Sequence, residues 1–404
     1  MMNTFNHFSL KSLNYRKIYY LGSIITLFLI IVHSTLSITN IEFNLTKNFH
    51  NYLLPFFASW NIYFLLKDKL NEKLLFSLIF IILGVIVLLL SGSKLILKFS
   101  CICLMLANLD YKKIIKIHFW TSLFVLVLTL SMYFCSFIDI EPISLRGGKI
   151  RNTFGYIHPN FLGSIIFSLI MSYWVIYRSK ISDLITILLL FFAYLFLNNF
   201  VDSRTNEYLC LIGMVTVAYT LISKELFSNF FKYIDKYLLY YAIFFGFLFL
   251  FLLCIYISYN YNPTVEFYSW IDKLLSGRVR LSYEGLIKYG MSIWGQKTSI
   301  VDIPIPCSGA FALTKYEFFD SLYINIPIKH GLVSLAIYVI CYMIIIKNCY
   351  FKLDYRSAFV LCLFLIHGIS ERHFIFINFN IFIFLVFTNL VCKKIFAQPP
   401  KLSK

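Results

Sequence analysis

The sequence predicts an all-α, polytopic integral membrane protein with about 12 transmembrane helices and one large extracytoplasmic segment. Of its 404 residues, 60% are hydrophobic and 14% are charged, and a soluble core cannot hide so much apolar surface. The Lys and Arg residues punctuate the apolar runs instead of forming one patch. The net charge of +17 therefore indicates loop anchors in a membrane and argues against nucleic acid as a partner.

Each membrane span needs about 20 apolar residues. The apolar segments that we count as candidate spans, several of them shorter than this, are 18–39, 49–66, 74–92, 95–109, 118–138, 161–177, 184–201, 208–223, 238–259, 321–346, 357–370 and 374–392. The chain shows no repeat of fixed period and no Pro-rich or Gly/Ser linker. We therefore expect one membrane domain, 1–404.

The distribution of basic residues predicts the orientation of these spans. With the N-terminus inside, every inner loop is basic, as the positive-inside rule requires. The same orientation places a smaller loop, 139–160, and the large segment, 260–320, outside. The outer parts also carry basic residues, against the trend: Arg146, Lys149, Arg151, Arg204, Arg278, Arg280, Lys288 and Arg372. Either headgroups and loop solubility account for these charges, or an anionic ligand binds outside.

The middle of the large segment, 275–290, has the pattern of one helix entered through a small-residue turn. On such a helix Arg280, Glu284 and Lys288 follow one face at i, i+4 and i+8, and Arg278 lies about 200° from Arg280. We expect Arg280 to pair locally, which leaves Arg278 for a phosphate or carboxylate from elsewhere. The alternative is that Arg278 only anchors the helix to lipid headgroups.

The smaller outer loop ends in Arg151-Asn152-Thr153-Phe154-Gly155-Tyr156-Ile157-His158-Pro159-Asn160 and runs into an apolar span. Pro159 suits the first turn of that helix, where its missing N–H costs nothing. The free N–H groups of a helix start attract anions, so Arg151 and His158 lie beside a candidate anion site. Alternatively, His158 is a hydrogen-bonded bystander at the interface.

Several motifs together resemble a known family. They are Arg-x-x-Phe-Gly-Tyr-x-His-Pro-Asn from Arg151, Leu-x-Ser-Gly-Arg followed by Tyr-Glu from Leu274, Ile293-Trp294-Gly295-Gln296, Asp320 and Tyr323 leading into a span with Gly331, and the short outer turn Ser203-Arg204-Thr205. Taken together, in their order along the chain, they resemble the Wzy-type polysaccharide polymerases, which belong with the O-antigen polymerases and ligases. The resemblance covers the chain from about residue 140 to the C-terminus.

This resemblance implies a glycosyltransferase of the bacterial cytoplasmic membrane with an outward-facing active site. Its donor and acceptor would be undecaprenyl-pyrophosphate-linked oligosaccharides, and its product a capsule, an exopolysaccharide or an O-antigen. A ligase that moves finished glycan to a different acceptor is one alternative. A flippase or transporter of the same lipid-linked sugar is another, although it predicts deep charges and twofold symmetry that the sequence lacks. A structural scaffold would leave the outer arginines unexplained.

Glycosyl transfer from a lipid pyrophosphate needs cations at the leaving group and a base for the acceptor hydroxyl. The predicted pyrophosphate contacts are Arg151, Arg204, Arg278, Arg280 and Tyr323. The candidate bases are Asp320, His158, Glu371 and His373. Asp320 is favoured because it closes the long loop at the mouth of the next span, although the related ligases have a His there. An Asp is a weaker base than a His unless burial raises its pKa. Arg278 is also predicted to act in catalysis, and His330, Glu371 and Arg372 are weaker candidates.

The acidic pair of Asp139-Ile140-Glu141 has a spacing that other membrane glycosyltransferases use to bind a divalent cation. Salt bridges to the neighbouring basic residues explain the pair more simply, so we expect neither a metal nor a cofactor. The expected partners are the two lipid-linked glycans and membrane lipid, with a chain-length regulator and a flippase left open.

Overall fold

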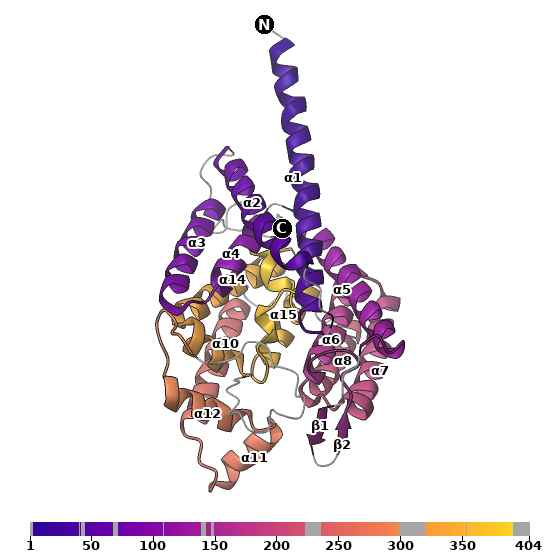
Figure 1. The fold of residues 1–404 in the computed structure, drawn as a ribbon, viewed down its shortest axis with the longest axis vertical. Coiled ribbons are helices and arrows are strands. Elements are labelled where there is room, and N and C mark those ends of the chain that lie inside the picture. The colour runs from indigo at the N-terminus through magenta and orange to yellow at the C-terminus, as the bar shows by residue number, and fades with distance from the viewer. Residues whose placement is uncertain are drawn as a thin grey trace.

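The structure is a computed structural model that describes residues 3–39, 41, 45–67, 72–107, 109–138, 143–146, 149–222, 236–298, 320–352 and 354–390. Within these ranges the chain is almost entirely helical (Figure 1). The exception is a hairpin of two antiparallel strands, β1 (Ile143–Arg146) and β2 (Lys149–Arg151), with Ile143 opposite Arg151. The membrane-helix class predicted from composition is therefore confirmed, with this hairpin as an addition.

The helices before residue 223 are α1 (Asn3–Leu36), α2 (Leu45–Lys67), α3 (Glu72–Ser91), α4 (Leu95–Met105), α5 (Tyr111–Phe134), α6 (Pro159–Ile176), α7 (Lys180–Phe196) with its π-helical extension η1 (Leu197–Val201), and α8 (Arg204–Ile222). The later ones are α10 (Lys236–Tyr259), α11 (Glu266–Leu274), α12 (Arg278–Tyr289), α13 (Leu322–Asn325), η3 (Ile326–His330), α14 (Leu332–Phe351), α15 (Tyr355–His367), η4 (Arg372–Ile375) and η5 (Phe382–Phe387).

Six of the described helices contain a stretch long and apolar enough to cross a membrane: Lys17–Leu36, Tyr111–Phe134, Pro159–Ile176, Lys180–Val201, Arg204–Ile222 and Leu332–Cys349. Shorter apolar helices add Leu75–Ser91, Leu95–Met105, Phe244–Tyr259 and Tyr355–His367. The short elements α11 and α12 lie with β1 and β2 at one end of the molecule, and the N-terminus of α1 lies at the opposite end (Figure 1). We refer to the first of these as the α12 end.

The predicted helical span 374–392 is wrong as to secondary structure. Its described part forms the 3₁₀ turns η4 and η5 joined by irregular chain, and all six side chains of η5 are buried. The carbonyls of Phe387 and Thr388 accept hydrogen bonds from Lys73 at the start of α3. Irregular backbone is tolerated in such a place because surrounding protein, and not lipid, satisfies its polar groups. The run is apolar because it fills the core.

The predicted span 321–346 is also not one continuous helix. It consists of α13, η3 and α14, and the break falls at Gly331, whose φ is +91°. Glycine adopts this left-handed region without the steric penalty of a Cβ atom. The break turns the preceding segment, which carries Lys329 and His330, away from the axis of α14.

Buried ion pairs hold α15 to the helices before it, near the end opposite α12. Arg356 lies 2.7 Å from Asp183 of α7 and donates to the Trp174 carbonyl of α6 at 2.9 Å. Asp183 also accepts from the Trp174 indole at 2.8 Å. Each buried charge thus has an opposite charge and further hydrogen bonds, the condition for tolerating it. This arrangement fixes α15, and with it the position of the residues that follow its C-terminal end.

Candidate functional site

The site begins at the turn between α11 and α12, where Ser276 and Gly277 have φ values of +64° and +84°. This tight turn starts α12 with Arg278 pointing toward the body of the protein, where it is 7% exposed. Arg280 is exposed, and its backbone N–H donates to the Asp272 carboxylate at 2.9 Å. The helix predicted for this stretch is therefore present, and its buried arginine is Arg278.

Arg278 is paired with two carboxylates from distant parts of the chain. Its Nε lies 3.2 Å from Oδ2 of Asp320, and its Nη2 forms an ion pair with Oε1 of Glu371. Its Nη1 donates to the carbonyl of Leu275 at 3.2 Å. The expectation that Arg278 has no partner within the protein is thus corrected. The expected local pair between Arg280 and Glu284 is absent among the ion pairs of the described residues, because a surface pair in water gains little.

Asn160, in the first turn of α6, connects this ion pair to the motif on the smaller loop. Its amide nitrogen donates to Glu371, and its Oδ1 accepts from Ser203 at 3.0 Å and from Arg151 at 3.5 Å. One connected polar cluster therefore contains Glu371 and residues of four separated motifs, around 151–160, 203–204, 278 and 320. We call Arg151, Asn160, Arg278, Asp320 and Glu371 the arginine–carboxylate cluster.

Asp202 holds the two other predicted arginines. The Arg151 guanidinium donates to the Asp202 carbonyl at 2.9 Å, and its Nε lies 3.6 Å from the Asp202 carboxylate. Arg204 lies 3.9 Å from the same carboxylate, and its side chain is 45% exposed. Burial lowers the pKa of Arg151, against the effect of Asp202 beside it. Arg151 is thus built into the cluster, whereas Arg204 stays at its accessible edge.

Two predicted residues have positions that favour structural roles. His158 is the N-cap of α6, and its Nδ1 accepts the backbone N–H of Asn160 at 3.2 Å. Tyr323 is fully buried, and its hydroxyl donates to the Leu365 carbonyl at 2.9 Å. The prediction of Tyr323 as a substrate contact is corrected, because a buried ring with a satisfied hydroxyl has no access to a ligand.

Both carboxyls of the cluster have shifted pKa values. Burial raises the pKa of Asp320, and it raises that of Glu371 to about 8, although Arg278 beside them acts in the opposite direction. The repulsion of Asp320 also raises the pKa of Glu371. Of the two, Glu371 can take up a proton near neutral pH. The condition that sequence reasoning set for Asp320 to act as a base is met.

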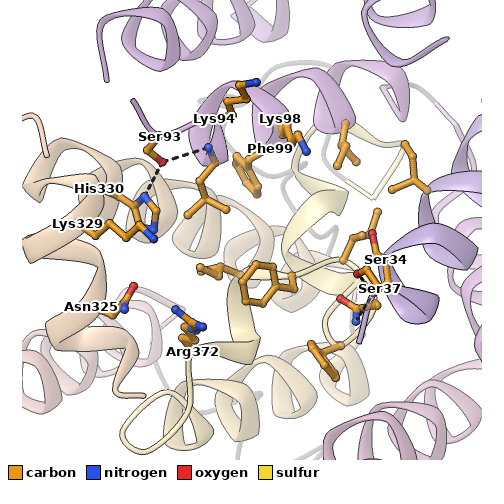
Figure 2. A pocket seen from close by; sticks show the side chains of 18 of the residues that line it. Ser34, Ser37, Ser93, Lys94, Lys98, Phe99, Asn325, Lys329, His330 and Arg372 are labelled. Atoms are coloured by element: carbon orange, nitrogen blue, oxygen red, sulfur yellow. Dashed lines mark hydrogen bonds between the residues drawn. The ribbon is translucent and has the colours of Figure 1, made fainter. Parts of the chain in front are cut away.

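A cavity of about 640 Å³ lies between the C-terminal end of α1, the turn from α3 to α4, η3 and η4. His330 is on its wall and shares a hydrogen bond of 2.6 Å with Ser93. Arg372 also lines it, next in the chain to Glu371 of the arginine–carboxylate cluster (Figure 2). Of the weaker candidates, Glu371 therefore belongs to the cluster and Arg372 lines the cavity next to it.

No protein-family model, curated protein or solved structure matches this chain. The function of the chain is therefore inferred from the site itself and from its sequence motifs.

Sequence reasoning missed three lysines that line the cavity, Lys94, Lys98 and Lys297. Their signal was present, because the predicted orientation puts the short turn between spans 74–92 and 95–109 outside. A lysine in that turn opposes the positive-inside trend in the same way as the outer arginines do. Lys98 follows one helical turn later.

The predicted acidic pair Asp139 and Glu141 and the side chain of His373 lie outside the described residues. Within the described part of the chain, no group of three or more His, Cys, Asp or Glu side chains could hold a metal ion.

Proposed function

We propose that this chain is a polysaccharide polymerase that joins undecaprenyl-pyrophosphate-linked oligosaccharide repeat units at the outer face of the bacterial cytoplasmic membrane. One observation carries the proposal. Residues of the separated motifs that resemble Wzy-type polymerases meet in the arginine–carboxylate cluster, although they are far apart in sequence. A set of unrelated surface charges gives no reason for such convergence.

In the proposed reaction, a hydroxyl of the acceptor sugar attacks the anomeric carbon of the donor. A new C–O glycosidic bond forms, and the bond to the pyrophosphate oxygen breaks. The electron pair leaves with undecaprenyl pyrophosphate, whose charge is stabilised by basic side chains at the site. The hydroxyl proton passes to a carboxylate of the protein.

Asp320 is the better base of the two carboxyls. Its side chain is 16% exposed, whereas that of Glu371 is 2% exposed. Its raised pKa makes Asp320 a stronger base than an exposed Asp. Glu371 then acts through Arg278: it holds the guanidinium, which in turn orients Asp320. Arg151 fixes the cluster to Asp202, and Arg204 is the accessible cation at its edge.

The test is a gel ladder of lipid-linked and surface glycan from cells that lack this protein and carry native chain or Asp320→Asn. Deletion should leave single repeat units, the native chain should restore the ladder, and Asp320→Asn should lower polymerisation by about 10²- to 10⁴-fold, the range for loss of a general base. The matched control is Glu266→Gln, an exposed carboxyl of α11 outside the quoted motifs that should restore the ladder fully.

Three outcomes would contradict the proposal in different ways. Long polymer that accumulates on the lipid carrier in the deletion strain indicates a ligase. Single repeats trapped on the inner leaflet indicate a flippase. An unchanged glycan indicates a scaffold. Membrane levels of each variant are measured by immunoblot, so that a missing ladder is not confused with missing protein.

A further inference from the structure

The cavity beside the arginine–carboxylate cluster has an unbalanced charge. Five cationic side chains line it, namely Lys94, Lys98, Lys297, Lys329 and Arg372, and none of its lining residues in the described part of the chain is Asp or Glu. Arg372 also acts electrostatically on Asp320 and Glu371 of the neighbouring cluster. Basic side chains thus predominate on the lining of the cavity, and one of them, Arg372, connects it to the cluster.

The local structure adds to this positive charge. Lys94, the N-cap of α4, and Lys98, in its first turn, are four residues apart, so their like charges repel and destabilise the helix. The N-terminus of α4 also lies at the cavity, and the side chain of its N-cap residue, Lys94, makes no capping hydrogen bond, although the Leu95 N–H donates to Ser93 at 3.3 Å. Partial positive charge from this helix start adds to the two ammonium groups. An arrangement of this kind becomes more stable when a multiply charged anion binds.

The cavity also offers hydrogen-bonding groups around the cations. In Figure 2, Lys98 reaches in from α4, Lys329 and His330 lie on the wall formed by η3, and Arg372 points in from below. Ser93, Asn325 and Gln296 line the same space. Three or more separated donors with positive charge match the several oxygens of a phosphate or pyrophosphate better than the two oxygens of one carboxylate.

We infer that this cavity is a binding site for a phosphate-type polyanion, and that Lys98, Lys329 and Arg372 are its principal ligands. The assignment of that anion to the pyrophosphate of the lipid-linked donor rests on the proposed function, whereas anion binding itself does not. In this arrangement Arg372 contacts the anion while Glu371, the preceding residue, belongs to the cluster that carries the base. The leaving group and the base would then be held by adjacent residues of one turn.

The test uses the full chain in nanodiscs of neutral phosphatidylcholine, titrated calorimetrically with inorganic pyrophosphate. We expect saturable binding that weakens with salt, and a loss of about tenfold in affinity for each of Lys98→Gln and Lys329→Gln, because each removes one charge-assisted contact. Lys116→Gln, an exposed lysine of α5, is the matched control and should bind like the native chain. Thermal unfolding without ligand should show Lys98→Gln at least as stable as native, because it relieves the repulsion from Lys94.

A second arm identifies the source of the anion. In discs that also contain phosphatidylglycerol, a lower apparent affinity for pyrophosphate means that lipid headgroups enter the same cavity, whereas equal affinity means that the site selects pyrophosphate. Either result supports a phosphate site. The inference is overturned if the native chain binds no pyrophosphate, if the Lys98→Gln/Lys329→Gln double variant binds as tightly as native, or if Lys116→Gln loses as much.

The glycan ladder separates this inference from the proposed function. If Lys98→Gln weakens pyrophosphate binding but supports a normal ladder, the anion site stands and its assignment to the donor fails. If deletion leaves the ladder intact, the proposed function fails while the binding result is unaffected.

Discussion

Replacing Arg278 with glutamine removes the guanidinium that contacts both Asp320 and Glu371. Glutamine is nearly as long as arginine's aliphatic stem but carries no charge, so the substitution leaves two carboxyls without their shared partner. Glu371 is 2% exposed and cannot turn to water, whereas Asp320, with 16% of its side chain exposed, recovers part of its hydration.

The expected loss is dominated by Glu371. Removal of one partner from a buried ion pair costs about 3–5 kcal/mol, because the other charge stays buried. Arg278 lowers the pKa of both carboxyls, so its removal raises their pKa values further and favours protonation. A protonated carboxyl is no longer a buried charge, and the deficit should therefore shrink as the pH falls toward about 8, the pKa of Glu371 in the native chain, and stay constant at lower pH, where Glu371 is protonated in both chains.

The assay is reversible unfolding in mixed micelles by titration with sodium dodecyl sulfate, at pH 6 and at pH 9, which lie about two units below and about one unit above the native pKa of Glu371. Arg280→Gln is the matched control: it removes an exposed arginine two residues along α12 and should change the free energy of unfolding by at most about 0.5 kcal/mol. The double variant Arg278→Gln/Glu371→Gln should recover part of the loss. The reasoning is refuted if Arg278→Gln costs no more than Arg280→Gln, or if its deficit grows as the pH falls.

Two further predictions concern stability. The protonated form of Glu371 stabilises the fold fully below pH 4.5, its ordinary pKa, and this contribution is lost as the pH rises through about 8. Glu371→Gln should therefore flatten the fall in Tm between these two pH values, as measured by scanning fluorimetry. An unchanged slope of Tm against pH would contradict this assignment to Glu371. Gly331→Ala should cost at least about 1–3 kcal/mol, because its Cβ would lie 2.3 Å from the Gly295 nitrogen and its φ is +91°. Gly246→Ala, with open space around its Cβ, should instead stabilise α10 by up to about 1 kcal/mol, and equal effects of the two would contradict this account.

The sequence predicted the helices well wherever an apolar run formed one continuous helix, as in α5, α6 and α8. It failed at 374–392, because hydropathy reports burial and this run is buried in protein without being helical. The break inside 321–346 was not predicted either. A glycine in an apolar run is common, and the positive φ of Gly331 depends on contacts with residues near 293 that the run itself does not contain.

At the site, the sequence predicted which residues gather but not how they pair. Arg151, Arg278, Asp320 and Glu371 all lie between or next to spans, in segments that the predicted orientation puts on one side of the membrane, so topology brings them to the same side. Their partners depend on how α12 turns onto the protein, which no local pattern encodes. Periodicity accordingly favoured a partner for Arg280 and none for Arg278, the reverse of the arrangement found.

The segment Ser292–Gln296 runs along the helix break at Gly331 and exchanges four backbone hydrogen bonds with it, at 2.9–3.3 Å. Two of them connect Ser292 to the Pro327 carbonyl and the Leu332 N–H to Ser292. These bonds satisfy backbone groups that a broken helix would leave exposed at membrane depth. Because this segment precedes α14 in the chain, it leaves the ribosome first and is available as soon as α14 emerges. The order of synthesis thus lets the interrupted helix complete its hydrogen bonding as it is inserted. In a circular permutation that opened the chain between Gln296 and α14, α14 would be synthesised before the segment Ser292–Gln296, and its backbone groups would stay unpaired until that segment followed.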